Sequence, residues 1–244
     1  VIGGREFAGQ GWRMLMECLA AGRSVSLPSS SAGAAKLALR TTSAYSRVRS
    51  QFKISIGKFE GIEEVLARMA GNTYAIDAAR TMTAGSIDLG EKPSVISAIV
   101  KYHCTERARQ VINDAMDVHG GKGICLGPNN YLGRAYQQIP IGITVEGANI
   151  LTRSMMIFGQ GAIRCHPYVL REIDATRNKD PKQASREFDK AFWGHVGFVL
   201  SNAARSVWQG VSGARLVSVP GAPELRSYTR QLTRLCAGFA FSAD

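Results

Sequence analysis

The chain has 244 residues, of which 45% are hydrophobic and 20% are charged, and its formal net charge is +11. This composition is typical of a globular protein with a substantial core, and no apolar run approaches the roughly 18 residues that suggest a membrane span. The five cysteines are odd in number, widely scattered and never spaced as C-x-x-C, which argues against a disulfide framework and against a structural metal site. We expect reduced thiols in a cytoplasmic protein. Because the chain starts without methionine or a leader, we also expect a fragment of a longer protein.

The positive charge favours acidic partners. Basic residues are nevertheless spread along the chain, and no run interleaves them with aromatic residues. Their densest cluster is Arg47 and Arg49, with Lys53 close behind. We therefore expect a solvated basic surface or a site for a small anionic ligand, such as a phosphate-rich cofactor, and no nucleic acid.

Apolar residues recur with helical periodicity through most of the first 119 positions. The pattern predicts four long helical stretches, at 11–23, 29–50, 61–89 and 93–119. Pro28 should separate the first two, and Gly90 and Gly120 should end the others. These helices exceed the usual length of about 11–12 residues and are joined by short turns. The sequence therefore predicts an all-α fold, an antiparallel bundle of long helices.

The remaining chain is less regular. Glycine and proline predict an irregular loop over 124–144, and a fifth helix follows from 146 to 163. Beyond this point the sequence predicts an amphipathic helix at 188–208 and a last helix near Glu224. Residues 1–10 are expected to be the tail of a strand. We accordingly expect a bundle domain at 11–165 and a helical C-terminal extension at 166–244.

Residues 143–151 have the sequence ITVEGANIL, in which Glu146 is the only charged residue of an apolar run. A charge in such surroundings needs a partner or a function. The residues alone leave three interpretations open. Glu146 is an acid in the first turn of a helix, which is favourable by roughly 0.3–1 kcal/mol, or a paired core charge, or a catalytic base.

Three further motifs each have a structural and a functional interpretation. The HGG sequence at 119–121 would stop a helix, but paired glycines also let another molecule approach the backbone. Arg49 and Phe52 would be an ordinary helix end, or a guanidinium fork for a pyrophosphate beside an apolar wall. Arg23 would complement the dipole at the end of the first helix.

The order of these motifs is more specific than any one of them. In sequence they are Gly22-Arg23, YSRVRSQF (45–52), DAMDVHGGKGI (114–124), a loop with Arg134, and VEGANIL (145–151). In this order the chain resembles the carboxy-terminal helical domain of the acyl-coenzyme A dehydrogenases over residues 1–163. The segment after 166 resembles the long bacterial branch that serves fatty-acid β-oxidation.

The resemblance implies a flavoprotein with FAD that oxidises fatty acyl-CoA to trans-2-enoyl-CoA. It implies an electron-transfer flavoprotein or a similar electron acceptor as a partner, and a homo-oligomer. It also implies a preceding β-domain, of which residues 1–10 would be the end. The expected location is the cytoplasm, with peripheral association at the inner face of the membrane as a further expectation.

The resemblance also assigns roles to single residues. Glu146 matches the catalytic base, and Gly147 would keep the approach to it open. Arg49 and Phe52 match an Arg-x-x-Phe motif that contacts the diphosphate and adenine of FAD, usually in a neighbouring subunit. The cofactor-binding set is completed by Asp117, His119, Gly120 and Gly121.

Arg23 falls near a family arginine that lies beside the substrate. Some family members carry the base one residue before that arginine. Here this position is Gly22, which cannot ionise, and this favours Glu146 as the base. The chain also departs from the family pattern at Lys53, Glu60, Asp117 and Ala148, where the family has Gly, Gln, Gln and Thr, and of these only Asp117 is kept as a cofactor-binding residue.

Three alternatives remain. The same fold and base would serve an acyl-CoA oxidase that passes electrons to oxygen. A basic helical module without enzyme activity would bind nucleic acid or another anionic surface. A structural relative would keep the fold without the chemistry, although the intact Glu146-Gly147 pair argues against this.

Overall fold

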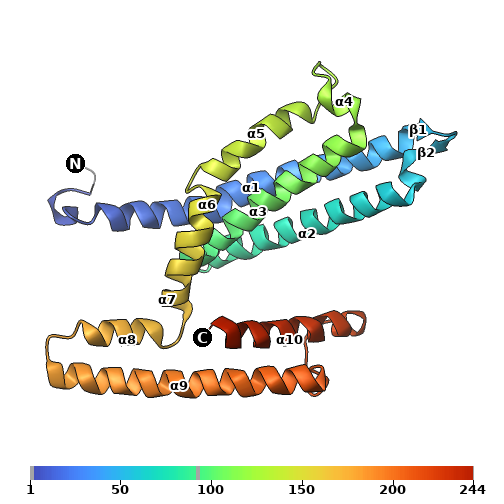
Figure 1. Cartoon of the computed structure of the whole chain (residues 1–244). Coiled ribbons are helices and arrows are strands. Elements are labelled where there is room, and N and C mark those ends of the chain that lie inside the picture. Colours follow the sequence, from blue (N-terminus) through green and yellow to red (C-terminus); the bar gives the residue numbers. More distant parts are fainter. Residues whose placement is uncertain (1–2, 92–93, 244) are drawn as a thin grey trace. The chain divides into compact units, whose positions relative to one another are not determined.

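The computed structural model describes residues 3–91 and 94–243. The described chain is almost entirely helical, which confirms the all-α prediction (Figure 1). It divides into two compact units, Val1–Gly161 and Ala162–Asp244. The division lies a few residues before the boundary expected from the sequence.

Three long helices form the body of the first unit: α1 (Gly11–Val48), α2 (Glu60–Asp88) and α3 (Ser94–His119). A hairpin of β1 (Ser50–Gln51) and β2 (Ile54–Ser55), followed by the 3-10 turn Ile56–Lys58, joins α1 to α2. The three helices lie side by side, and successive ones run in opposite directions (Figure 1). Gly90 and Gly120 follow α2 and α3 with φ of 85° and 55°, as expected of glycines that end helices.

Small residues on α1 let the neighbouring helices approach closely. Ala32, Ala35 and Ala38 are almost completely buried and form one stripe of the core. The larger core side chains come mainly from α2 and α3 (Met69, Ile76, Val100, Val111, Ile112 and Met116). This distribution follows the apolar periodicity from which the bundle was predicted.

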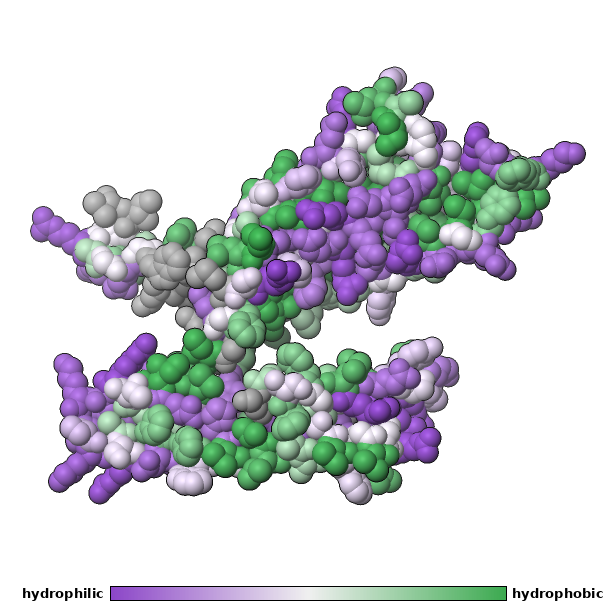
Figure 2. All heavy atoms as spheres, viewed as in Figure 1, coloured by the Kyte–Doolittle hydropathy of each residue, from purple (hydrophilic) through white to green (hydrophobic). Residues whose placement is uncertain are grey.

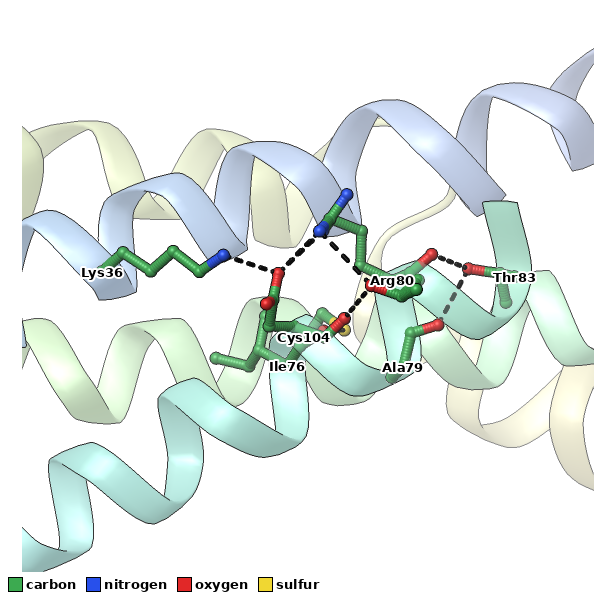
Figure 3. Close-up of polar contacts among 8 residues, drawn as sticks. Lys36, Ile76, Ala79, Arg80, Thr83 and Cys104 are labelled. Carbon is green, nitrogen blue, oxygen red and sulfur yellow. Dashed lines mark hydrogen bonds and ion pairs between the residues drawn. The ribbon is translucent and has the colours of Figure 1, made fainter. Parts of the chain in front are cut away.

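Polar contacts cross-link the three helices beside this core (Figure 3). Lys36 of α1 and Arg80 of α2 each bind Asp77 of α2 at 2.8 Å. The buried Cys104 thiol of α3 donates to the carbonyl of Ile76 at 3.9 Å. Burial raises the pKa of the Cys104 thiol to about 11, so the thiol stays protonated at neutral pH.

Helix α1 continues through Pro28, so the predicted interruption at this residue is wrong. Proline has no N–H to donate to the carbonyl four residues earlier, which belongs to Ser24. That carbonyl accepts a hydrogen bond of 3.0 Å from Thr83 Oγ1, and Thr83 is fully buried on α2. A side chain of another helix thus supplies a hydrogen bond that the backbone cannot, and α1 reaches 38 residues.

The prediction of an irregular loop over 124–144 is also wrong in its second half. After the single turn α4 (Gly121–Ile124), helix α5 occupies Gly133–Thr144. Asn130 Oδ1 accepts hydrogen bonds from the backbone N–H groups of Leu132 and Gly133 at 2.9 and 2.8 Å. It therefore satisfies N–H groups that a helix start leaves unpaired, as an N-capping side chain does.

The next helix begins at Asn149 and not at 146 as predicted. Helix α6 (Asn149–Leu151) continues through the π-helical segment Thr152–Gln160 into α7 (Gly161–Cys165). Glu146 therefore lies in the connection between α5 and α6.

The strand tail expected at the start of the chain is absent from residues 3–10. These residues contain a 3-10 helix, Arg5–Phe7, and Gly3, Gly4 and Gly9 adopt positive φ. A strand must pair its backbone N–H and C=O groups with another strand. In the described part of the chain the only sheet is the β1–β2 hairpin, so no partner strand is present. Residues 1 and 2 of the expected strand lie outside the described residues.

The second unit contains α8 (Val169–Thr176), α9 (Pro181–Ser212), the 3-10 turn Pro223–Leu225 and α10 (Arg226–Ala243). Asp180 caps α9 by accepting a hydrogen bond of 3.0 Å from the N–H of Lys182, and Gly213 follows its last turn with φ 62°. The amphipathic helix expected at 188–208 is the central part of α9.

Large apolar side chains remain exposed on the second unit. Figure 2 shows green apolar atoms over much of the visible face of this unit. Exposed examples on α9 and α10 are Trp193, Leu200, Trp208, Leu235 and Phe239. Amphipathic periodicity therefore produces helices here whose apolar faces are only partly covered within the unit.

Candidate active site

The Glu146-Gly147 turn has an unusual backbone. Glu146 has φ 53° and Gly147 has φ 91°, so both residues occupy the left-handed region. Glycine tolerates this conformation, whereas a residue with a Cβ does so at a cost and only where its surroundings hold it. Because Glu146 precedes α6 by three residues, its carboxylate is not an acid in the first turn of a helix.

The Glu146 carboxylate lies against α1 at Gly22. A Cβ placed on Gly22 would be 3.4 Å from Oε1 and 3.6 Å from Oε2 of Glu146. Oε2 is buried, and no described residue donates a hydrogen bond to it. An unpaired carboxylate oxygen inside a protein costs free energy. The bare backbone of Gly22 therefore gives room to a carboxylate, one oxygen of which is buried without a hydrogen-bond donor among the described residues.

Arg23 lies on the other side of the same turn. It is 3% exposed, its Nη1 is 3.0 Å from Met156 Sδ, and its Nη2 is 3.8 Å from the position of a Cβ on Gly147. Burial lowers the pKa of Arg23, and the negative charge of Glu146 partly offsets this effect. The structure thus brings together three residues that the sequence singled out: Arg23, Glu146 and Gly147.

Lys101 completes this cluster and was missed by the sequence analysis. Its side chain on α3 is fully buried, and its Nζ donates to the carbonyls of Ile143 and Gly147 at 3.2 and 2.8 Å and to Asn149 Oδ1 at 2.6 Å. Burial lowers the pKa of Lys101 to about 8. The charge of Arg23 also lowers it, while Glu146 and Glu106 raise it. The sequence did contain a signal, because Lys101 shares the helical periodicity of buried positions such as Cys104 and Ala108.

Asn149 and Thr152 connect the turn to the bundle. Asn149 Nδ2 donates to Thr105 Oγ1 at 2.9 Å and to Glu106 Oε1 at 2.8 Å, both on α3. Thr152 Oγ1 donates to the carbonyl of Gly147 at 3.1 Å. The turn that carries Glu146 is therefore held by hydrogen bonds to Gly147 and Asn149 from α3 and from Thr152, which restrain its backbone.

The expected cofactor-binding residues lie at the other end of α1 and α3. Arg49 follows the last turn of α1 and is exposed, and Phe52 occupies the hairpin turn with φ 51° and 88% exposure. The ring of Phe52 meets only the edge of Phe59, with centroids 6.4 Å apart. No acceptor for the Arg49 guanidinium is present in residues 3–91 and 94–243. Both side chains are thus free to contact another molecule.

The backbone after His119 is the accessible part of the HGG motif. His119 Nδ1 lies 2.8 Å from the carbonyl of Ala115 and Nε2 lies 2.6 Å from Tyr131 Oη, while its ring stacks on Tyr45 at 4.2 Å. A carbonyl only accepts, so Nδ1 donates, and in the neutral ring Nε2 accepts from Tyr131. Burial lowers the pKa of His119, which favours this neutral form. Both ring nitrogens of His119 therefore have partners within the protein. Gly120, Gly121 and Asp117, in contrast, are exposed.

The structure separates the two groups of candidate residues. Arg23 and Arg49 are 26 positions apart on α1, which is about 39 Å at 1.5 Å per residue. Tyr45, one turn before Arg49, stacks on His119, so the HGG motif belongs to the far group. A single chain therefore cannot bring Glu146 and Arg49 to the same part of one ligand.

The described residues contain neither a metal-binding cluster nor a membrane-spanning helix. No group of three or more His, Cys, Asp or Glu side chains is arranged to hold a metal ion. None of the described helices combines the length and the hydropathy that crossing a bilayer requires.

Comparison with protein families gives two matches that together span most of the chain. A family model described as "Acyl-CoA dehydrogenase, C-terminal domain" matches residues 9–158. A second, described as "Acyl-CoA dehydrogenase, C-terminal, bacterial type", matches residues 163–244. The first match alone covers more than half of the chain.

Individual relatives agree with these matches. A 3-(aryl)acrylate reductase of Clostridium sporogenes is 29% identical over 140 residues, which cover 57% of this chain and 36% of the relative. The mitochondrial very long-chain specific acyl-CoA dehydrogenase of Mus musculus is 31% identical over 146 residues, which cover 59% of this chain and 22% of the relative. The solved butyryl-CoA dehydrogenase of Megasphaera elsdenii aligns with a TM-score of 0.57 and 28% identity over 64% of this chain and 39% of that chain. The chain thus spans little more than a third, or less, of the length of these proteins.

Proposed function

Because the chain belongs to the acyl-CoA dehydrogenase family, we propose that its full-length protein is an FAD-dependent oxidoreductase that acts on the Cα–Cβ bond of an acyl thioester, with Glu146 as the base. The observation that carries this proposal is the Glu146 carboxylate, which is held against the bare backbone of Gly22 with one buried oxygen that no described residue binds. Arg23 and Lys101 feel the charge of Glu146, but neither donates a hydrogen bond to that oxygen. A base needs a lone pair that remains available to the substrate.

The proposed step at Glu146 is the removal of the α-proton of the thioester. This proton is weakly acidic, so the charge that develops on the thioester oxygen needs hydrogen-bond donors. The backbone N–H of Glu146 is available for this purpose, since no acceptor within residues 3–91 and 94–243 binds it. Gly147 has no side chain to obstruct the approach, and the apolar neighbours Val145 and Ile143 help to exclude water.

Bound FAD would supply the redox chemistry of the reaction, as the acceptor of the β-hydrogen in the form of a hydride. The residues at the far end of α1 and α3 fit the other half of this cofactor. The guanidinium of Arg49 has the planar fork that binds a diphosphate, Phe52 offers an exposed apolar ring, and the turn at Gly120 and Gly121 leaves the backbone accessible. Since about 39 Å separates this group from Glu146 along α1, we propose that it serves the FAD of a neighbouring subunit in a homo-oligomer.

We extend the proposal to fatty acyl-CoA as the substrate, trans-2-enoyl-CoA as the product and a place in fatty-acid β-oxidation in the cytoplasm. The match of residues 163–244 to the bacterial type of acyl-CoA dehydrogenase supports an acyl-CoA substrate; the fatty acyl chain and the pathway come from the resemblance of the segment after 166. An electron-transfer flavoprotein or a similar protein would reoxidise the flavin. The net charge of +11 suits the diphosphates of FAD and coenzyme A.

The absorbance spectrum of the purified full-length protein tests the proposal. We expect a flavin band that bleaches when a fatty acyl-CoA is added without oxygen. A protein without a flavin band would contradict the proposal and favour a basic binding module. Rapid peroxide formation in air on addition of the substrate would instead identify an acyl-CoA oxidase.

A further inference from the structure

We propose that Lys101 is a positioning residue. It binds backbone carbonyls before and after Glu146 and thereby holds Glu146 in its left-handed conformation. The inference rests on the proposed role of Glu146 as the base. It concerns a residue on α3 that does not itself need to touch the substrate.

The acceptors of Lys101 enclose Glu146 in the sequence. The carbonyl of Ile143 lies three residues before Glu146, and that of Gly147 follows it directly, at 3.2 and 2.8 Å from Nζ. The third acceptor, Asn149 Oδ1, lies at the start of α6 at 2.6 Å. An ammonium group has three N–H donors and no acceptor, so the three bonds use all of its capacity. The three N–H donors of Lys101 thus all bind acceptors at the end of α5, in the turn after it and at the start of α6.

The connection needs such a restraint for two physical reasons. A glutamate at φ 53° is in a strained conformation for a residue with a Cβ, and the surroundings must maintain it. The carbonyls at the end of α5 also have no partner within the helix and carry partial negative charge. A buried ammonium at this point satisfies the Ile143 carbonyl and fixes the following turn. If Glu146 relaxed to a right-handed or extended conformation, its carboxylate would move away from Gly22.

The alternative is that Lys101 only stabilises the bundle. Its acceptors argue against this, because all three belong to residues 143–149 and none to α1 or α2. The carbonyl of Gly147 also keeps a second donor, Thr152 Oγ1 at 3.1 Å, when Lys101 is changed. The loss of Lys101 should therefore affect the turn more than the fold.

The test compares three variants of the full-length, flavin-loaded protein with wild type. Lys101→Met keeps the length of the side chain and removes its donors. Arg68→Met is the matched control, since it removes a cation bound to Asp114 of α3 at 2.9 Å, away from the turn. Glu146→Gln reports on the base itself. Measured quantities are flavin content, kcat, KM and the exchange rates of the backbone amides of residues 145–148.

We expect Lys101→Met to retain its flavin, to lose on the order of 10²-fold in kcat with little change in KM, and to exchange the turn amides faster than wild type. We expect Arg68→Met to match wild type in kcat and in exchange of these amides. A normal kcat in Lys101→Met beside an inactive Glu146→Gln would overturn the inference on Lys101 alone. A normal kcat in Glu146→Gln would instead overturn the base assignment, and the role of Lys101 with it.

A second variant covers the case in which Lys101→Met does not fold. Lys101→Gln keeps two N–H donors and is assessed by the same measurements, with a smaller expected loss of about tenfold in kcat. If neither variant folds, Lys101 is required for folding rather than for positioning, and the inference is wrong.

Discussion

The carboxylate of Glu146 lies against Gly22: its Oε1 is 3.4 Å from the point that a Cβ on Gly22 would occupy. One residue is a charged side chain in a left-handed turn, and the other is a position on a long helix that has no side chain. Their contact places the proposed base beside α1, while one of its oxygens has no donor among the described residues.

This contact predicts that a small side chain at position 22 is tolerated by the active site and that a large one is not. A methyl group at this position would be at ordinary contact distance, and replacing glycine inside a helix adds about 0.5–1 kcal/mol of stability. Gly22→Ala should therefore raise the free energy of unfolding with a change of less than about threefold in kcat. Gly22→Leu should displace the carboxylate and lower kcat more than tenfold. Urea denaturation and steady-state kinetics measure both effects, and an active Gly22→Leu enzyme would contradict the placement of Glu146.

Arg49→Ala should weaken the retention of FAD without affecting the fold. A hydrogen bond to a charged group contributes about 1.5–3 kcal/mol, so we expect a 10- to 100-fold weaker FAD affinity. Arg47 is the control, because it is also exposed, near the same helix end, and outside the matched motif. Flavin content after gel filtration measures the effect. Equal flavin content in Arg49→Ala and Arg47→Ala would show that Arg49 has no special role.

The lowered pKa of Lys101 predicts a dependence of stability on pH. Its pKa is about 8 in the folded protein, against 10.5 for an ordinary lysine, because of burial and Arg23, with Glu146 and Glu106 acting in the opposite direction. Between these values the unfolded chain binds more protons, so the free energy of unfolding gains a contribution that rises with pH. Below about pH 8 both states hold the proton and this contribution is constant.

The stability of wild type minus that of Lys101→Met isolates this contribution, since methionine does not titrate. The difference should rise between about pH 8 and 10.5 and should be flat below pH 8. Urea denaturation of both proteins across this range provides the measurement. A difference that stays flat through that window would mean that Lys101 keeps its proton in the folded state.

The hydrogen bond from Thr83 to the Ser24 carbonyl should contribute to the free energy of unfolding. Thr83→Val removes the hydroxyl that donates to the Ser24 carbonyl beside Pro28, and should lower the free energy of unfolding by about 1 kcal/mol or more. Thr83→Ser keeps the donor and should lose less. Thermal or urea unfolding compares the two, and a larger loss in Thr83→Ser than in Thr83→Val would indicate that packing of the methyl group dominates.

Local signals in the sequence predicted the main features of the bundle. The apolar periodicity located three helices, because their core faces repeat at the helical spacing, and Gly90 and Gly120 marked two helix ends through a conformation that glycine favours. Motif order also singled out Arg23, Glu146 and Gly147, which the structure places together.

The errors arise where one side-chain hydrogen bond decides the local structure. The continuation of α1 through Pro28 depends on Thr83, which is far away in the sequence. The side chain of Asn130 supports the start of α5, whereas in the sequence Asn130 is grouped with the glycines and prolines as a sign of a loop. Lys101 was missed because its acceptors lie more than 40 positions away, so no local pattern contains them.

The role of Glu146 is tested most directly by Glu146→Gln in the full-length protein, observed through the flavin band and through exchange of the α-proton of a bound acyl-CoA with solvent deuterium. The amide has nearly the shape of the carboxylate but cannot accept the proton, so flavin content should be unchanged while exchange and bleaching slow by about 10²–10⁴-fold or more. Bleaching and exchange at the wild-type rate in a variant that retains its flavin would show that another group removes the proton.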